Sequence, residues 1–265
     1  MFGYTYDGTF AGLLTTVFDI YERRSWPGTI SKAGLTQGNL FGQAIAVNTD
    51  ESKADRVWQG LLKHISEAAR SSLYKVFLSE LLQIEMLLFQ YMQLAFSSNK
   101  SIEENFAEDC VRRIAEINKQ VFREKHRMEA FVRFQKTTDD LYYATIEPDF
   151  NVLPLLEDHF EKRYADQCWL IYDIRRHYGL YYDLQQVKQV VLESEKVNKS
   201  GCLSPDILAQ HEALYQQLWK TYFNHVNIPE RKNPKLHLRH MPQRYWKYLT
   251  EKKPDNGTNT ASQEK

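Results

Sequence analysis

The sequence has little cysteine, and this already excludes several classes of site. Of 265 residues only Cys110, Cys168 and Cys202 are cysteines, and no two of them form a CxxC pair. An odd number of separated cysteines does not fit a zinc ribbon, an iron–sulfur cluster or a disulfide framework. The cysteine content favours a reducing, cytoplasmic location.

Long hydrophobic runs are also missing. The first residues, MFGYTYDGTF, lack the basic and apolar regions of a signal peptide. The most apolar stretch, Val76 to Phe96, contains six polar residues, and these would be costly in hydrocarbon. We therefore expect no membrane partner and no membrane span.

The motifs of common catalytic and cofactor sites are absent as well. The sequence contains no GxSxG, HExxH, P-loop, GxGxxG or CxxxCxxC pattern. His237 and His240 are three residues apart, but without a neighbouring carboxylate they are more typical of a basic surface than of a metal site. No cofactor and no metal are predicted.

The bulk composition is that of a globular protein. Hydrophobic residues make up 43% and charged residues 26% of the chain, and the 34 Lys and Arg are matched by 34 Asp and Glu. We expect one globular domain over residues 1–253, and a disordered tail over residues 254–265, which has nothing to bury.

The hydrophobic spacing predicts an α+β fold that is mainly helical, with a small antiparallel sheet. Residues 1–128 are predicted to be helical apart from short strands at 2–6 and 44–47, with Thr9 and Ser101 as helix caps and a break near Ser66 or Ser71-Ser72. Residues 203–253 are predicted to be helical and basic, beginning at Ser204-Pro205 and ending in a short helix that Pro242 opens.

Between these regions, residues 129–192 switch to the period of β-strands. The order is strand, strand, helix, strand, strand, strand, and the short connections favour antiparallel pairing. Asn151 is the expected cap of the intervening helix. The expected strands are 130–135, 141–146, 168–172, 178–182 and 187–192.

Positive charge gathers near the carboxyl end. From Arg231 to Lys253 there are eight Lys or Arg and a single acid, Glu251, with Tyr245, Trp246 and Tyr248 among them. Cations neutralise phosphates, and exposed rings stack on bases, so the segment indicates nucleic acid as the partner.

Two further clusters combine cations with histidine. One is Arg123-Glu124-Lys125-His126-Arg127, and the other is the turn Asp173-Ile174-Arg175-Arg176-His177. Each could contact phosphate or hold an acid or base, or could be a solvated helix end or a polar hairpin turn. The candidate catalytic residues are His126, Asp173 and His177. The residues expected to contact nucleic acid are Arg123, Lys125, Arg127, Arg175, Arg176, Arg231, Lys232, Lys235, Arg239, His240, Arg244, Trp246 and Lys247.

Four segments carry a resemblance to a known family. They are FGYTYDGTFAGLLTTVFDIYE, REKHRMEAFVRFQ, PDFNVLPLLEDHFEKRYADQCWLIYDIRRHYGLYYD and LWKTYFNHVNIPERKNPKLHLRHMPQRYWKYL. Over residues 1–253 the chain resembles the bacterial DUF4130 family of DNA metabolism or DNA repair proteins. The resemblance implies DNA as a partner, together with a radical-SAM DNA repair protein and a uracil-DNA-glycosylase-like protein.

The resemblance supplies no catalytic residues. It marks only positions within the matched segments: Tyr4, Asp7, His126, Arg127, Asp149, Asn151, Arg163, Tyr164, Asp173, Arg176, Lys232, Asn233, His237, Arg239, His240, Arg244 and Trp246.

Three functional hypotheses follow. The first is a DNA-binding accessory factor in repair, which holds the backbone with its basic segment and stacks Tyr245 or Trp246 on a base. The second is an enzyme that acts directly on damaged or modified DNA. The third is an adaptor that docks a partner protein without touching DNA, because Arg, Tyr and Trp also anchor protein interfaces.

Overall fold

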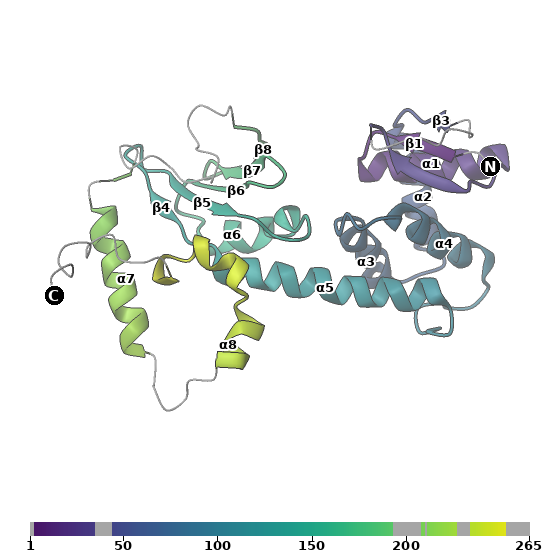
Figure 1. Ribbon diagram of the computed structural model, residues 1–265. Coiled ribbons are helices and arrows are strands. Elements are labelled where there is room, and N and C mark those ends of the chain that lie inside the picture. The colour runs from purple at the N-terminus through teal and green to yellow at the C-terminus, as the bar shows by residue number, and fades with distance from the viewer. Residues whose placement is uncertain (1–2, 35–43, 193–207, 210, 227–233, 253–265) are drawn as a thin grey trace, which may run out of the picture. The chain divides into compact units, whose positions relative to one another are not determined.

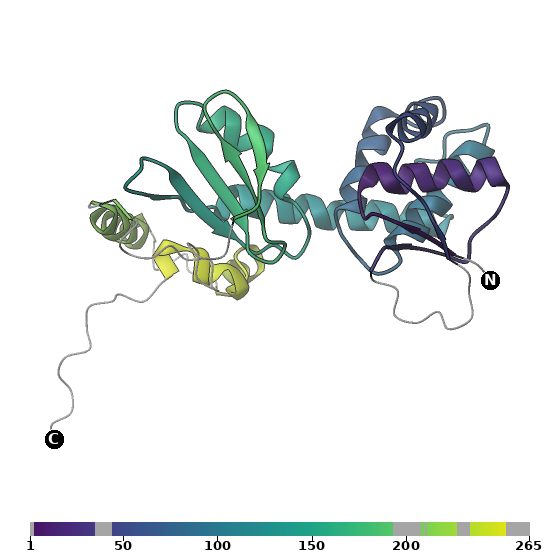
Figure 2. The ribbon, with the colours of Figure 1, turned by 90° about the horizontal axis from the view of Figure 1, so that it is seen from above.

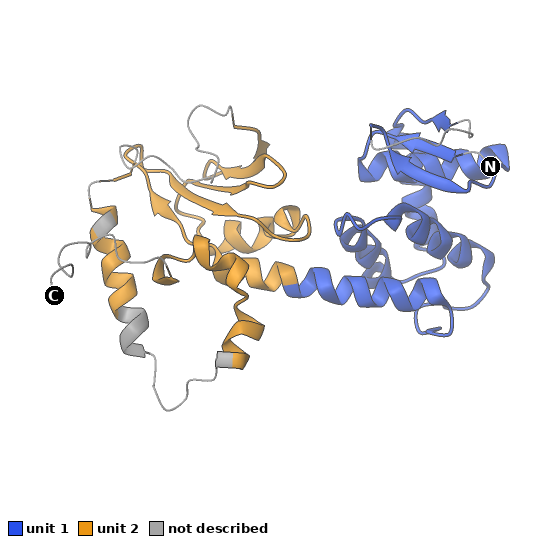
Figure 3. Cartoon of the chain, viewed as in Figure 1, with its two compact units in different colours: residues 1–123 blue, residues 124–265 orange. Residues whose placement is uncertain are grey.

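The fold is described from a computed structural model, which covers residues 3–34, 44–192, 208–209, 211–226 and 234–252. The contacts divide the chain into two compact units, residues 1–123 and residues 124–265 (Figure 3). The boundary lies within helix α5, Asp109–Phe131. The single-domain organisation over residues 1–253 stays a prediction, and the tail lies outside the described residues.

Unit 1 contains a parallel three-stranded sheet in the order β2-β1-β3 (Figure 1). Strand β1 (Gly3–Tyr6) pairs with β2 (Thr29–Lys32) on one side and β3 (Ala44–Ala46) on the other. Its alternating sequence buries Tyr4 and Tyr6 on one face. The strands predicted at 2–6 and 44–47 are confirmed, whereas β2 was not predicted.

Four helices of unit 1 precede α5: the first lies between β1 and β2, and the other three follow β3. Helix α1 (Phe10–Arg23) begins at the predicted cap, where the Thr9 hydroxyl accepts the Gly12 amide at 2.9 Å. Helices α2 (Glu51–Leu61) and α3 (Glu67–Phe77) are separated at Ser66, and α4 (Ile84–Ser97) comes next. Of the two predicted break points, Ser66 is therefore correct, because Ser71 and Ser72 lie inside α3.

Helix α5 corrects two predictions. It begins at Asp109 rather than after Ser101, and it runs to Phe131, so the first two residues of the strand predicted over 130–135 are helical and only Gln135 lies in a strand, β4. Met128 and Phe131 continue the buried helical stripe of Val121 into this segment. The steps of seven and three between these residues are helical, and they outweigh the alternation read from the sequence.

The sheet of unit 2 is mixed, which corrects the antiparallel prediction. Its order is β4-β5-β6-β7-β8, and all neighbours are antiparallel except β5 and β6, which are parallel. A helix connects β5 to β6, and a crossover of this kind permits parallel pairing. The bounds of the strands are β4 Gln135–Lys136, β5 Tyr142–Ile146, β6 Trp169–Asp173, β7 Tyr178–Tyr182 and β8 Val187–Val190.

The remaining elements of unit 2 surround this sheet; Figure 2 shows them from above. The crossover contains a 3₁₀ turn, Leu153–Leu155, and helix α6, Glu157–Arg163. Asn151 does not cap a helix, because its side-chain oxygen accepts the Tyr178 hydroxyl at 2.5 Å. The later elements are α7 (Glu212–Val226), α8 (Pro234–His240) and two 3₁₀ turns, η4 (Gln243–Tyr248) and η5 (Thr250–Lys252).

The helices and two sheets confirm the α+β class. The helix start predicted at Ser204-Pro205 lies outside the described residues, and the helix predicted after Pro242 is the 3₁₀ turn η4. Within the described ranges, no helix is both long enough and apolar enough to cross a membrane.

Candidate functional site

The basic C-terminal segment is built into the core of unit 2. Tyr245 is 1% exposed and Leu249 is fully buried. The Tyr245 hydroxyl donates to Glu124, a buried carboxylate that also accepts the Asp149 amide at 2.9 Å. Burial, and then the bond to Glu124, raises the pKa of Tyr245. Tyr245 is therefore not available to stack on a base.

Several cations of the predicted nucleic-acid surface already have carboxylate partners. Arg244 lies 2.5 Å from Asp149 and 3.5 Å from Glu124, and Arg127 lies 3.3 Å from Glu124. Lys247 is paired with Glu147, and this contact, together with the Tyr248 hydroxyl, lowers the pKa of Glu147. These pairs reduce the charge that the segment offers to phosphate.

The turn after β6 is a second paired cluster. Asp173 is fully buried, bonds Arg176 at 2.8 Å and accepts the amides of Arg175 and Arg176. Burial raises the pKa of Asp173, against the lowering effect of the Arg176 hydrogen bond. Both arginines also donate to the Asp149 carbonyl, at 3.4 and 3.1 Å. The turn thus binds the 147–149 segment that Arg244 and Lys247 contact.

The candidate catalytic residues do not form one site. His177 is exposed and has φ +57°, the left-handed conformation of a turn residue. Asp173 is enclosed by its own turn, and neither residue lines the pocket described below, whereas His126 does. Their assignment to catalysis stays a prediction.

The other predicted contacts differ in exposure. On α8, Lys235, Arg239 and His240 are exposed, and no described carboxylate lies within ion-pair distance of them. Trp246 is half-buried and donates to the Met241 carbonyl at 3.1 Å. Lys125 is paired with Glu129, Arg123 belongs to unit 1, and Arg231 and Lys232 lie outside the described residues.

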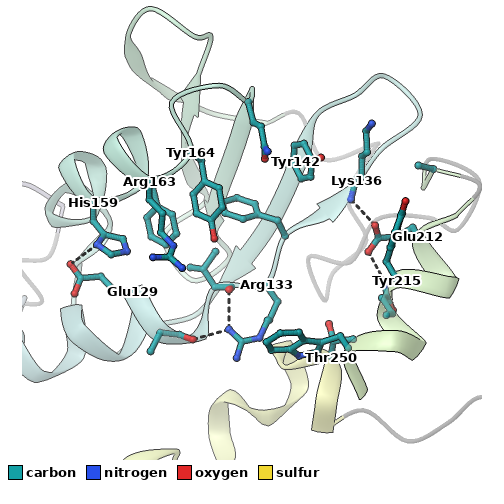
Figure 4. A pocket seen from close by; sticks show the side chains of 18 of the residues that line it. Glu129, Arg133, Lys136, Tyr142, His159, Arg163, Tyr164, Glu212, Tyr215 and Thr250 are labelled. Carbon is teal, nitrogen blue, oxygen red and sulfur yellow. Dashed lines mark hydrogen bonds and ion pairs between the residues drawn. The ribbon is translucent and has the colours of Figure 1, made fainter. Parts of the chain in front are cut away.

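A pocket of about 1010 Å³ lies entirely within unit 2 (Figure 4). It is formed by the end of α5, strands β4 and β5, α6, the start of α7 and the turn η5. The lining residues are His126, Glu129, Ala130, Val132, Arg133, Phe134, Lys136, Tyr142, His159, Phe160, Arg163, Tyr164, Gln167, Ala209, His211, Glu212, Tyr215, Gln216, Trp219 and Thr250.

Charged side chains line the pocket from two parts of unit 2. Glu129 lies in the last turn of α5 and Arg133 follows the end of that helix, while His159 and Arg163 are four residues apart on α6. Figure 4 shows His159 and Glu129 turned toward one another, with Arg163 beside them. Among the described residues, Arg163 has no carboxylate within ion-pair distance, and its guanidinium lies 5.8 Å from the Tyr164 ring centre.

Aromatic rings form much of the remaining lining. Phe160 and Tyr164 are stacked with an interplanar angle of 10°, and Phe134 meets both edge-on. Tyr215 and Trp219 line the pocket from α7, and the Tyr215 side chain is 60% exposed. A planar ligand can therefore contact rings on more than one wall.

Polar contacts fix the α7 wall. The Glu212 carboxylate accepts the Lys136 amide at 3.1 Å, and the Ala209 amide donates to the Lys136 carbonyl at 2.9 Å. The Trp219 indole donates to Glu251 at 2.9 Å, and Arg133 bonds the same carboxylate at 2.9 Å. Although burial opposes it, these two donors lower the pKa of Glu251.

Metal chemistry has no evident ligand set in the parts of the chain that the structure describes. There, no group of three His, Cys, Asp or Glu side chains could hold a metal ion. The histidines and carboxylates of the pocket are better suited to hydrogen bonding and proton exchange.

Most of the pocket residues were missed in the sequence. His126 alone was a candidate for chemistry, and Arg163 and Tyr164 were marked only as positions within the segments of the family resemblance. One sequence signal for the pocket was available. His159 and Arg163 are four residues apart, as are Phe160 and Tyr164, so a helix places a polar row beside an aromatic row. The contribution of α7 comes from residues about 80 positions away from β4 and has no local signal.

Comparison with known proteins gives one family and one distant structural likeness. No curated protein matches the chain. A pGpG-specific phosphodiesterase, PggH from Vibrio cholerae, aligns with 86% of this chain and 100% of its own, at 10% identity and a TM-score of 0.28. A likeness this low carries no inference about fold or function.

The family match covers the last third of unit 1 and nearly all of unit 2. Residues 82–251 match DUF4130, a domain of unknown function, and residues 1–81 lie outside that match. This extent is shorter than the resemblance over residues 1–253, and it includes the whole pocket. The chain therefore belongs to the DUF4130 family.

Proposed function

We propose that the protein binds nucleic acid in DNA metabolism or repair, and that the pocket of unit 2 holds an unpaired nucleotide. The observation that carries the proposal is the presence of aromatic rings and the unpaired Arg163 in one pocket. Rings stack on bases of any sequence, and a guanidinium binds phosphate. The pocket combines both within a single unit.

Size and lining support a nucleotide as the ligand. A volume of about 1010 Å³ is at the upper end of small-molecule sites and accommodates a base, a sugar and a phosphate. A base within a duplex is stacked on both sides and cannot enter such a pocket. The ligand is therefore an unpaired or extruded nucleotide, as in proteins that take a base out of its stack.

The backbone contacts differ from those expected at first. Arg244, Lys247 and Arg127 are engaged by carboxylates, so they contribute less than their number suggests. The exposed Lys235 and Arg239 of α8 are better suited to phosphates on either side of the bound nucleotide. The basic segment thus still contacts the nucleic-acid backbone in this proposal, but mainly through the cations of α8.

In this proposal the protein acts as an accessory factor. It presents an unpaired nucleotide to a partner that performs the reaction, such as the radical-SAM or uracil-DNA-glycosylase-like protein that the family resemblance implies. The resemblance alone supports the identity of these partners.

Fluorescence anisotropy with labelled single-stranded and duplex DNA tests the proposal. We expect tighter binding to the single strand, an affinity that falls as salt rises, and a loss of about tenfold in Tyr215→Ala, which removes an exposed ring. Lys188→Gln is the matched control, because Lys188 is exposed and pairs with Asp183 away from the pocket. Absence of binding at low salt, or binding that ignores salt, contradicts the proposal.

A protein–protein adaptor is the second candidate, and α7 favours it. Leu214 and Leu218 are 53% and 55% exposed on this helix, next to Tyr215. Exposed apolar residues at helical spacing are typical of a docking surface. Capture of the radical-SAM partner that survives nuclease treatment, and is lost in Leu218→Glu, supports this candidate; a complex that nuclease dissolves contradicts it.

A further inference from the structure

One corner of the pocket places two histidines around a single carboxylate. The Nδ1 atom of His126 lies 3.5 Å from Glu129, and that of His159 lies 3.8 Å from the other Glu129 oxygen. The Glu129 side chain is 15% exposed, whereas that of His126 is 78% exposed. The carboxylate thus lies at the base of the corner, and His126 lies at its rim.

The charge of Glu129 is already matched by a cation outside the pocket lining. Lys125, one turn earlier on α5, lies 2.5 Å from Glu129 and is not a lining residue. The corner therefore keeps Arg163 as an uncompensated charge, with the two imidazoles as additional donors. Such a set attracts an anion rather than a cation.

We propose that this corner, formed by His126, His159 and Arg163, binds the terminal phosphate of a single-stranded nucleic acid or nucleotide. The inference rests on the proposed function, since it names the part of the ligand that the pocket recognises. It extends that function from an unpaired nucleotide to a phosphorylated chain end.

The number of donors favours a phosphate monoester over a diester. A monoester carries nearly two negative charges and three terminal oxygens, whereas an internal diester carries one charge. Arg163 offers several N–H groups. Each imidazole turns Nδ1 toward Glu129, so its other nitrogen, Nε2, donates to the phosphate when the ring is protonated. Three donor side chains from two helices match three oxygens.

The neighbouring rings place the base of the same nucleotide. His159 and Arg163 form one row on α6, and Phe160 and Tyr164 form the adjacent row. Tyr164 is half-buried and lies beside the Arg163 guanidinium. A terminal phosphate on Arg163 therefore brings its base next to the pocket rings.

Oligonucleotides of one sequence that differ only at their ends test the inference. The probes are single strands with a 5′-phosphate, a 3′-phosphate or hydroxyls at both ends, measured by anisotropy with an internal label. We expect one phosphorylated end to bind about tenfold tighter than the hydroxyl probe, the gain of a good charge-assisted contact. Equal affinity for all three probes overturns the inference while leaving the proposed function intact.

Variants separate the phosphate contact from general charge. Arg163→Gln is expected to abolish the preference for the phosphorylated end and to change binding of the hydroxyl probe by less than about twofold. Glu129→Gln leaves Lys125 as a further unmatched cation beside the corner and is expected to strengthen binding of the phosphorylated probe. Weaker binding in Glu129→Gln, or an unchanged preference in Arg163→Gln, contradicts the assignment.

Two controls complete the design. Tyr215→Ala removes a ring on the α7 wall and is expected to weaken all three probes by the same factor. Thymidine and thymidine monophosphate, compared by calorimetry, test the corner without a DNA strand. Preference for the monophosphate with no binding of any strand preserves the phosphate site and rejects the proposed function, whereas the lack of any preference rejects the site.

Discussion

Tyr245 anchors the C-terminal segment to the rest of unit 2. Its ring is buried, and its hydroxyl donates to Glu124, which also accepts hydrogen bonds from Arg127, Arg244 and the Asp149 amide. A buried carboxylate is stable only while its donors are present. The Tyr245 hydroxyl therefore contributes to the stability of unit 2 by keeping the buried Glu124 carboxylate hydrogen-bonded.

Removing that hydroxyl should destabilise the protein. Tyr245→Phe leaves the Glu124 carboxylate without one buried donor, and we expect the free energy of unfolding to fall by about 1–3 kcal/mol in urea denaturation. Tyr248→Phe is the matched control, because its hydroxyl donates to Glu147 at a more exposed position. A loss in Tyr248→Phe that equals the loss in Tyr245→Phe would show that burial of Glu124 is not the cause.

Gly12 shows a different constraint, one of space. A Cβ atom at this position would lie 2.3 Å from Asp7 Oδ1 and 2.9 Å from the Thr49 hydroxyl. Asp7 cannot easily move, since it accepts hydrogen bonds from Thr9 and Thr49. The close approach of α1 to this loop thus requires glycine.

Substitution at two helical glycines should have opposite effects. We expect Gly12→Ala to lower the free energy of unfolding by about 1–3 kcal/mol through overpacking. Gly60→Ala in α2, where the nearest atom is 3.8 Å away, should raise it by about 0.5–1 kcal/mol. Thermal unfolding of both variants decides the matter, and equal effects would contradict the steric account.

At the scale of elements, Glu251 joins three parts of unit 2. It accepts hydrogen bonds from Arg133, which follows α5, and from Trp219 of α7, while it lies itself in η5. Its side chain is fully buried. These two hydrogen bonds therefore connect α7 and the residues after α5 to η5, and all three segments line the pocket.

This contact should make stability depend on pH. Because the folded-state pKa of Glu251 is lowered, its contribution is present above the ordinary glutamate range and is lost as pH falls through the folded-state pKa. The difference in unfolding free energy between the wild type and Glu251→Gln should thus be largest near neutral pH and shrink in acid. Arg133→Gln should show the same convergence. A difference in unfolding free energy that stays constant with pH would contradict a stabilising role for the ionised Glu251 carboxylate.

Local signals predicted elements better than their pairing. The Thr9 cap and the break at Ser66 were read correctly, because a hydroxyl that accepts a nearby amide is a property of four residues. The parallel pairing of β5 with β6 was not predicted, since it depends on a crossover that contains α6. Strand β2 was missed because its four residues lie in a stretch without a repeating pattern.

The site was predictable only in part, for the same reason. Positive charge near the carboxyl end was evident, but its partners Glu124, Glu147 and Asp149 lie about 100 residues earlier in the chain. Charge counted along the sequence cannot show which acids return to it in the fold. The pocket likewise depends on α7 meeting β4, a contact that no local pattern encodes.

At the scale of the molecule, we propose that nucleotide recognition belongs to unit 2. This unit contains the pocket, the paired basic segment and the exposed cations of α8, and the family match covers most of it. Unit 1 has its own parallel sheet and its own core. All residues that line the pocket belong to unit 2, so the proposed binding site includes no residue of unit 1.

Photocrosslinking tests the central claim most directly. A single-stranded oligonucleotide with one 5-bromouracil base near its phosphorylated end is irradiated with the whole protein, and the linked peptides are identified by mass spectrometry. Linkage to Tyr164, Tyr215 or Trp219, reduced by unlabelled competitor with the same end, is the predicted result. Linkage confined to unit 1 or to the α8 cations would show that the pocket is not where the unpaired base binds.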